Sequence, residues 1–269
     1  MIIRVLLVAS VAFAGVSQSA FAAPPIGAWK VEASDLRCLV TRQYGDPKKP
    51  ITLALKAAPT ESTYQLAILR SGYRKGQLQS DATLTFDGQS FTESSLSYPT
   101  SGNKRVTHLI NLGTAQSSAA RTAKSVKIAI QEGLNDEFDL GPLPQPVLTE
   151  LNGCVDRLQD RWNIGDERQA KLRAGATGNL QRTAVVSGDD YPLTSQRLNQ
   201  QGSIRVLILV DETGMPKDCS VLQTSGSALL DSRTCGVIME RATFSPAIDQ
   251  SGKPAKSSFT QRMSWRLEG

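Results

Sequence analysis

The alternation of apolar and polar residues near the C-terminus constrains this chain more than any other feature. Residues 203–211, SIRVLILVD, carry branched apolar side chains at every second position, which predicts a β-strand. Residues 217–224 and 258–267 alternate in the same way. Residues 228–241 instead carry apolar side chains at the spacing of an amphipathic helix. One helix on one face of a small antiparallel sheet buries both sets of apolar side chains.

Turn and cap residues occur in a fixed order along the same stretch. They are Tyr191-Pro192, Gly202, Asp211, Gly214, Ser225-Gly226, Leu230-Asp231, Phe244-x-Pro246-Ala247 and Gly252-x-Pro254. This ordered set resembles the C-terminal domain of TonB-family energy transducers, over residues 189–269. The resemblance implies a non-enzymatic, periplasmic binding module. Such a module engages short segments of outer-membrane receptors, which pair as an added strand at the sheet edge.

The resemblance also implies where the partner binds. The pairing edge is expected at the last strand, with Tyr191-Pro192 nearby. The candidate partner-binding residues are Tyr191, Pro192, Thr260, Arg262, Ser264 and Arg266. The bland alternative is that the alternating polar residues of the last strand only form a solvated sheet surface. No catalytic residue, metal or cofactor is expected, and the partner is an outer-membrane receptor or another envelope protein.

The first residues have the pattern of a secretory signal. Residues 1–22 contain one charge at Arg4, a short apolar run over residues 5–16, and a small-x-small cleavage site at Ala20-Phe21-Ala22. The apolar run is about half of the ~20 residues that a spanning helix needs. We therefore expect a mature periplasmic chain without an integral membrane segment. Because a complete transducer needs an anchor and a long Pro-rich spacer, an adaptor linked to TonB-dependent transmembrane transport fits better.

Four cysteines in an exported chain suggest two disulfides, with three alternative pairings. Cys219 lies on the strand face expected under the helix, and Cys235 lies on the border of the apolar stripe of that helix. This arrangement favours a Cys219–Cys235 bridge. Cys38 and Cys154 flank the first domain and would then close a long loop.

The first part of the chain predicts a different architecture. Short β-rich runs separated by turns over residues 24–162 indicate a small sandwich or barrel, ending in an amphipathic helix over residues 147–162. The expected strands are 29–31, 37–42, 51–57, 64–69, 82–86, 105–112 and 124–130. Residues 163–188 are rich in Gly, Ala and charge and are expected to form a linker that is mobile apart from a turn or two of exposed helix over residues 166–173. The predicted fold class is α+β overall.

Charge and motifs argue against other classes of function. The net charge is +5, but residues 189–269 contain nine basic and nine acidic residues, so no basic stripe for nucleic acid exists there. The only histidine, His108, is not accompanied by a Gly-x-Ser-x-Gly elbow. Two alternatives remain: a secreted enzyme with its site in the β-rich domain, and a C-terminal domain used only to form an edge-to-edge homodimer.

Overall fold

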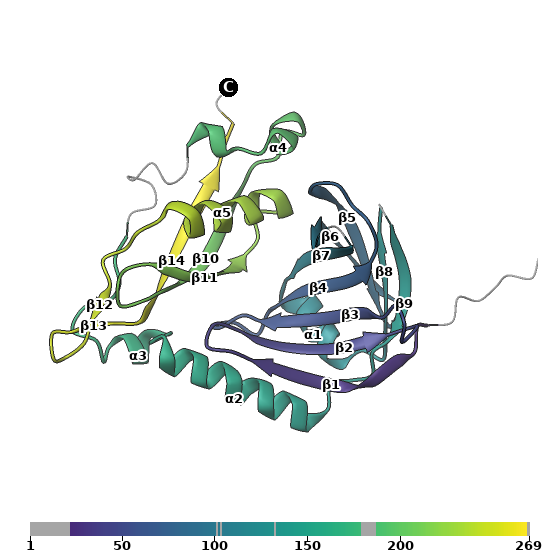
Figure 1. Cartoon of the computed structure of the whole chain (residues 1–269), viewed down its shortest axis with the longest axis horizontal. Helices are drawn as coiled ribbons and strands as arrows, with labels where there is room; N and C mark the ends of the chain where they lie inside the picture. Colours follow the sequence, from purple (N-terminus) through teal and green to yellow (C-terminus); the bar gives the residue numbers. More distant parts are fainter. Residues whose placement is uncertain (1–21, 101, 103, 132, 179–186, 268–269) are drawn as a thin grey trace, which may run out of the picture.

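The chain forms two β-rich bodies that lie side by side (Figure 1). The structure is a computed structural model, and it describes residues 22–100, 102, 104–131, 133–178 and 187–267. The predicted secretory signal lies outside the described residues, apart from Ala22. Mixed helices and strands confirm the α+β class.

The first body is one curled antiparallel sheet of nine strands in the order β1-β2-β3-β4-β7-β6-β5-β8-β9. The strands are β1 (Pro25–Ala33), β2 (Cys38–Tyr44), β3 (Ile51–Ala57), β4 (Tyr64–Ser71), β5 (Leu78–Phe86), β6 (Gln89–Thr100), β7 (Arg105–Leu112), β8 (Ser125–Ile130) and β9 (Leu134–Asp139).

A parallel bridge brings the two ends of this sheet together. Ala23, just before β1, donates to the carbonyl of Glu137 at 2.6 Å and accepts from the N–H of Asp139 at 3.3 Å. The curled sheet is therefore a barrel, one of the two architectures predicted. Its interior is filled by apolar residues from many strands, including Val40, Ile68, Leu84, Ile110, Ile128 and Phe138. Helix α1 (Thr114–Thr122) buries Ala120 in the same core.

Two strands of the barrel were not expected. β6 has few apolar residues, and two of its fully buried side chains are serines. Hydrogen bonds take the place of apolar contacts there: Ser95 Oγ donates to the carbonyl of Ser80 at 2.8 Å, and Ser97 Oγ lies 2.7 Å from His108 Nδ1. β9 is acidic and buries only Leu134 and Phe138. Their sequences therefore lack the apolar alternation that marks the other strands.

Helix α2 (Gln145–Arg161) lies along β1 and β2 and runs beneath both bodies (Figure 1). Its buried residues Leu151, Cys154 and Leu158 join the barrel core. A disulfide between Cys154 and Cys38 fixes the helix to the start of β2, with a Cα–Cα distance of 6.0 Å. This bridge confirms the expected pairing.

The segment after α2 is more ordered than a mobile linker over residues 163–178. Short helix α3 (Asp166–Gln169) is followed by two isolated bridges, from Ala174 to Ile248 and from Thr177 to Ser245. Residues 163–178 therefore pack on the C-terminal body, and the remainder of the expected linker includes residues 179–186, which are not described.

The second body has the predicted order of elements. A three-stranded antiparallel sheet, in the order β11-β10-β14, packs one face against α5. Its elements are η1 (Gly188–Asp190), α4 (Leu193–Arg197), β10 (Gly202–Val210), β11 (Pro216–Gln223), α5 (Ala228–Arg241), β12 (Ala247–Ile248), β13 (Pro254–Ala255) and β14 (Ser257–Trp265). Ser227 caps α5 by accepting from the N–H of Leu230.

Glycine is required at two positions of this sheet, the first residue of β10 and the turn between β10 and β11. A Cβ on Gly202 would lie 2.1 Å from the carbonyl oxygen of Ser225. Gly214 has φ +83°, and a Cβ there would lie 2.0 Å from the carbonyl oxygen of Phe244. The backbone segments approach too closely for any side chain at these positions.

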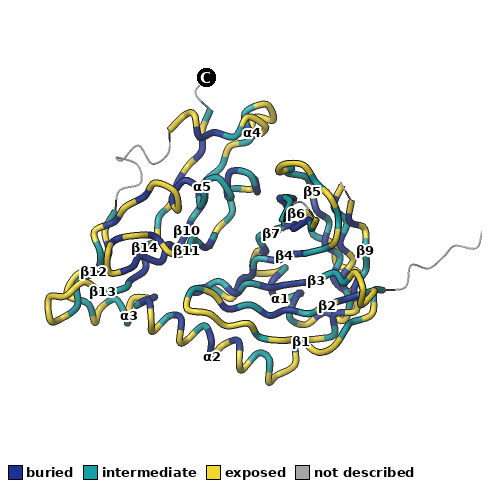
Figure 2. The backbone as a smooth tube through the Cα atoms, in the orientation of Figure 1, coloured by how far each residue is buried: buried dark blue, intermediate teal, exposed yellow. Residues whose placement is uncertain are grey.

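The barrel covers part of the second face of the sheet, so this face is solvated only in part. We call it the barrel-side face. Leu207, Leu209 and Leu222 are buried and belong to the same apolar cluster as the barrel core. β10 is consequently buried on both faces in the centre of the molecule (Figure 2). The sequence pattern had indicated only the helix side as core.

Candidate partner-binding edge

The C-terminal sheet has two edges, β11 and β14, and they lie in different surroundings. β11 faces the barrel: Asp218 Oδ2 lies 2.9 Å from Lys56 Nζ of β3, and the two side chains are only 16% and 18% exposed. Cys219, Ser220 and Val221 of β11 line a small space together with Ala57 and Tyr64 of the barrel. β14 pairs with β10 and with no other strand among the described residues.

The register of β14 determines which of its backbone groups point away from β10. The carbonyl of Ser258 accepts from the side-chain amide of Gln169 at 3.1 Å, and that of Lys256 accepts from Asn163 at 2.9 Å. On the opposite side, the N–H of Leu267 donates to the side chain of Gln201, just before β10, at 3.2 Å. Backbone groups of successive residues alternate between the two sides of a strand. The regular register with β10 therefore directs the N–H and C=O of the even-numbered residues outward.

The side chains of β14 alternate as predicted. Met263 and Trp265 are buried under α5, and the indole N–H of Trp265 donates to Thr234 Oγ1 at 2.9 Å. Thr260, Arg262 and Ser264 are exposed on the barrel-side face, and Arg266 is exposed just after the strand. The structure thus brings together four of the six predicted site residues along one edge, where outward backbone groups and exposed side chains coincide.

The other two predicted site residues do not lie on the exposed side of β14. Tyr191 is 8% exposed, and its ring meets that of Trp265 edge-on, with 5.2 Å between centroids. Its hydroxyl donates to the carbonyl of Gln200. Pro192 is half-buried at the start of α4. Tyr191 therefore holds the end of β14 in place through Trp265.

An ion cluster fixes the segment that carries Tyr191. Asp190 is buried and binds Arg233 and Arg241 of α5, the latter at 2.9 Å. Burial by itself raises the pKa of Asp190, but the N–H of Ser187 and the two guanidinium groups hold it well below its usual range. The carboxylate stays ionised and ties η1 to the helix.

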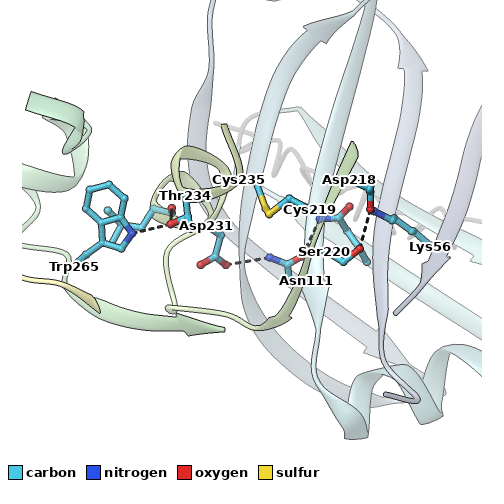
Figure 3. Close-up of a disulfide and its surroundings, with 11 residues drawn as sticks. Lys56, Asn111, Asp218, Cys219, Ser220, Asp231, Thr234, Cys235 and Trp265 are labelled. Atoms are coloured by element: carbon cyan, nitrogen blue, oxygen red, sulfur yellow. Dashed lines mark hydrogen bonds and ion pairs between the residues drawn. A yellow bond between two sulfur atoms is a disulfide. The ribbon is translucent and has the colours of Figure 1, made fainter. Parts of the chain in front are cut away.

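The predicted second disulfide is present at the β11 side of the sheet. Cys219 of β11 and Cys235 of α5 are bridged, with a Cα–Cα distance of 5.6 Å. Figure 3 shows this bridge beside the groups that join the sheet to the barrel. Among those groups, Asn111 of β7 donates to the buried carboxylate of Asp231 at 3.0 Å. The bridge and this contact hold α5, β11 and the barrel together.

The histidine is not arranged as a catalytic base. His108 is buried, and burial together with the charges of Arg70 and Arg74 lowers its pKa to about 4. Arg70 Nε donates to Nε2 at 3.2 Å, so the proton of the neutral ring lies on Nδ1 and points at Ser97. A serine nucleophile needs the opposite arrangement, with the ring nitrogen accepting. Ser97 and His108 form a structural pair.

The described part of the chain also lacks a cluster of metal-ligating side chains. No group of three or more His, Cys, Asp or Glu residues converges there as a metal site. A cavity of about 300 Å³ opens between the two bodies. The charged residues that line it, Glu61 and Arg205, form an ion pair with each other. Across the described ranges, no helix is both long and apolar enough to cross a membrane.

The C-terminal body is thus an α+β domain in which one helix covers one face of a three-stranded antiparallel sheet. Residues 187–267 match the family model described as Gram-negative bacterial TonB protein C-terminal. This part of the chain is therefore a TonB C-terminal domain. No curated protein matches the chain. The domain is of a non-enzymatic, envelope-associated kind and implies envelope protein partners.

Proposed function

We propose that this protein is a periplasmic adaptor that binds segments of envelope proteins, outer-membrane receptors above all, by strand addition at β14. The observation that carries the proposal is the uncovered edge with outward backbone groups at Thr260, Arg262 and Ser264. Unpaired N–H and C=O groups of an edge strand give affinity to any extended chain, and side-chain contacts add selectivity.

The barrel supports the same function by limiting where pairing occurs. It lies against β11 through Lys56 and covers Leu207 and Leu209 on the sheet face. A partner strand then has one edge to join. A link to TonB-dependent transport follows if the bound partners are the receptors of that pathway.

The test replaces one outward donor. Ser264→Pro removes an N–H that points away from β10 and leaves the ladder with β10 unchanged, whereas the matched control Ser264→Ala keeps the N–H and loses only the hydroxyl. The mature protein and both variants are used to capture partners from an envelope extract. We expect the native protein and Ser264→Ala to capture outer-membrane receptors. Ser264→Pro should bind them roughly ten-fold more weakly, because it loses the outward hydrogen bond and its ring crowds the partner strand.

Equal capture by Ser264→Pro would contradict pairing at this edge. Capture of no envelope protein by the native chain would remove the proposal altogether. Light scattering of the native protein separates the homodimer alternative, because a dimer that Ser264→Pro dissociates would mean that a second copy occupies the edge.

A further inference from the structure

Part of the β14 edge is already occupied by the chain itself. The side-chain amides of Asn163 and Gln169, which follow α2, bind the outward carbonyls of Lys256 and Ser258. Gln169 also donates to the hydroxyl of Ser258 at 3.1 Å. The ammonium of Lys256 lies 5.3 Å from the ring centroid of Trp162, which fixes the same corner. A visiting strand is therefore confined to the positions from Thr260 onward.

The remaining part of the edge is basic. Arg262 and Arg266 are exposed, and neither has an acidic partner among the described residues. The neighbour of Arg262 across the ladder is a third arginine, Arg205, on the same face. Arg205 is paired with Glu61 of the barrel, so the carboxylate beside Arg205 is already engaged. Like charges opposite one another in a sheet are unfavourable unless an opposite charge lies between or beside them.

We propose that this edge selects acidic extended segments, in a register fixed by Asn163 and Gln169; this inference rests on the strand addition proposed above. A strand paired with β14 places its side chains about 5 Å from those of Arg262 and its neighbours on the same face. Asp or Glu at alternate positions of the visitor meets Arg262 and Arg266, and guanidinium–carboxylate pairs can form two parallel hydrogen bonds. The occupant is a short acidic segment of an envelope protein.

A second copy of the chain is a poorer fit for the same edge. Antiparallel pairing of two β14 strands over residues 260–266 would bring the arginines of both copies onto one small face. No carboxylate on that stretch offsets them. The charge pattern therefore favours a partner of opposite charge over self-association.

The test is a selection from random eight-residue peptides displayed on phage, with the oxidised mature protein as the target. We expect Asp and Glu to be enriched about three-fold or more at alternate positions of the selected peptides, since two exposed ion pairs favour acidic over neutral residues by about that factor. The double variant Arg262→Glu/Arg266→Glu should select Lys and Arg instead. The control Lys30→Glu/Lys127→Glu changes the net charge equally at exposed positions of β1 and β8, and should keep the acidic preference.

The outcomes separate this inference from the function on which it rests. Selected peptides that bind the native protein but not Ser264→Pro, and that show no acidic preference, would leave strand addition standing and overturn the acidic selectivity. Retention of the acidic preference by Arg262→Glu/Arg266→Glu would overturn it too, because the arginines would then not set the preference. Loss of the preference in both charge-reversed variants would likewise overturn it, by attributing the effect to net charge. If no peptide binds the native protein better than Ser264→Pro, both proposals fail.

Discussion

The two edges of the C-terminal sheet belong to the same three strands but differ in what lies beside them. β11 faces the barrel through Asp218 and Lys56 and is bridged to α5 by a disulfide. β14 is touched on its outer side by the amides of Asn163 and Gln169 at its first residues, and its later residues are exposed. An open edge is a risk of unwanted pairing. The difference teaches that the barrel lies against the β11 side of the sheet and leaves the later part of β14 exposed, which is why the proposed pairing is assigned to β14.

The largest expected effect comes from removing the bridge at the protected edge. Cys219→Ala/Cys235→Ala opens a loop with a sequence separation of 16. In the chain-entropy model this lowers the free energy of unfolding by about 3 kcal/mol. Hydrogen exchange should show faster opening of β11 and α5 than of the barrel. A variant with native stability and native protection at β11 would contradict a bracing role for the bridge.

Two proline variants, compared with each other, test which backbone groups of β14 point toward β10 and which point outward. Gln261 is odd-numbered, so its N–H points at β10 opposite Val206, whereas that of Ser264 points outward. We expect Gln261→Pro to lower the free energy of unfolding by about 2 kcal/mol, because a ladder hydrogen bond is lost and a carbonyl is left without its donor. Ser264→Pro should cost clearly less. Urea unfolding measures both, and the reverse order would show that the outward groups are the odd-numbered ones.

The smallest expected effect is at the contact between β11 and the barrel. Asp218→Asn removes the charge partner of Lys56 in a mostly buried pair. Loss of the pair should destabilise the protein by about 1 kcal/mol, and more if Lys56 cannot reach water. The exposed pair of Arg161 with Asp35 offers the control Asp35→Asn, which should change stability little. Equal small effects from both variants would mean that the Lys56 contact does not hold the edge.

Local sequence patterns predicted the C-terminal body closely. Alternation over residues 203–211 and 258–267 and the helical stripe over 228–241 correspond to β10, β14 and α5. Cys219 and Cys235 could be paired because the strand and helix faces could be derived from those periods. In the barrel, β6 and β9 were missed. β6 buries serines, and β9 buries only two residues, so neither strand shows an alternation of apolar and polar residues.

The candidate site was predicted only in part, for a physical reason. The exposed residues Thr260, Arg262, Ser264 and Arg266 could be recognised by alternation, but Tyr191 could not be placed under Trp265 by any local pattern. Nor does a local pattern show that Asn163 and Gln169, about ninety residues earlier in the chain, close the first part of the edge.

The sequence by itself determined the order of the C-terminal elements, the two faces of their strands and the Cys219–Cys235 pair, because these depend on residues that are close in the chain or on the period of one element. Only the tertiary structure decided which edge of the sheet is covered. That outcome depends on where the barrel docks, through Leu207, Leu209 and the Lys56–Asp218 pair. Contacts between distant segments follow from the shapes of two folded surfaces, and no single stretch of sequence specifies them.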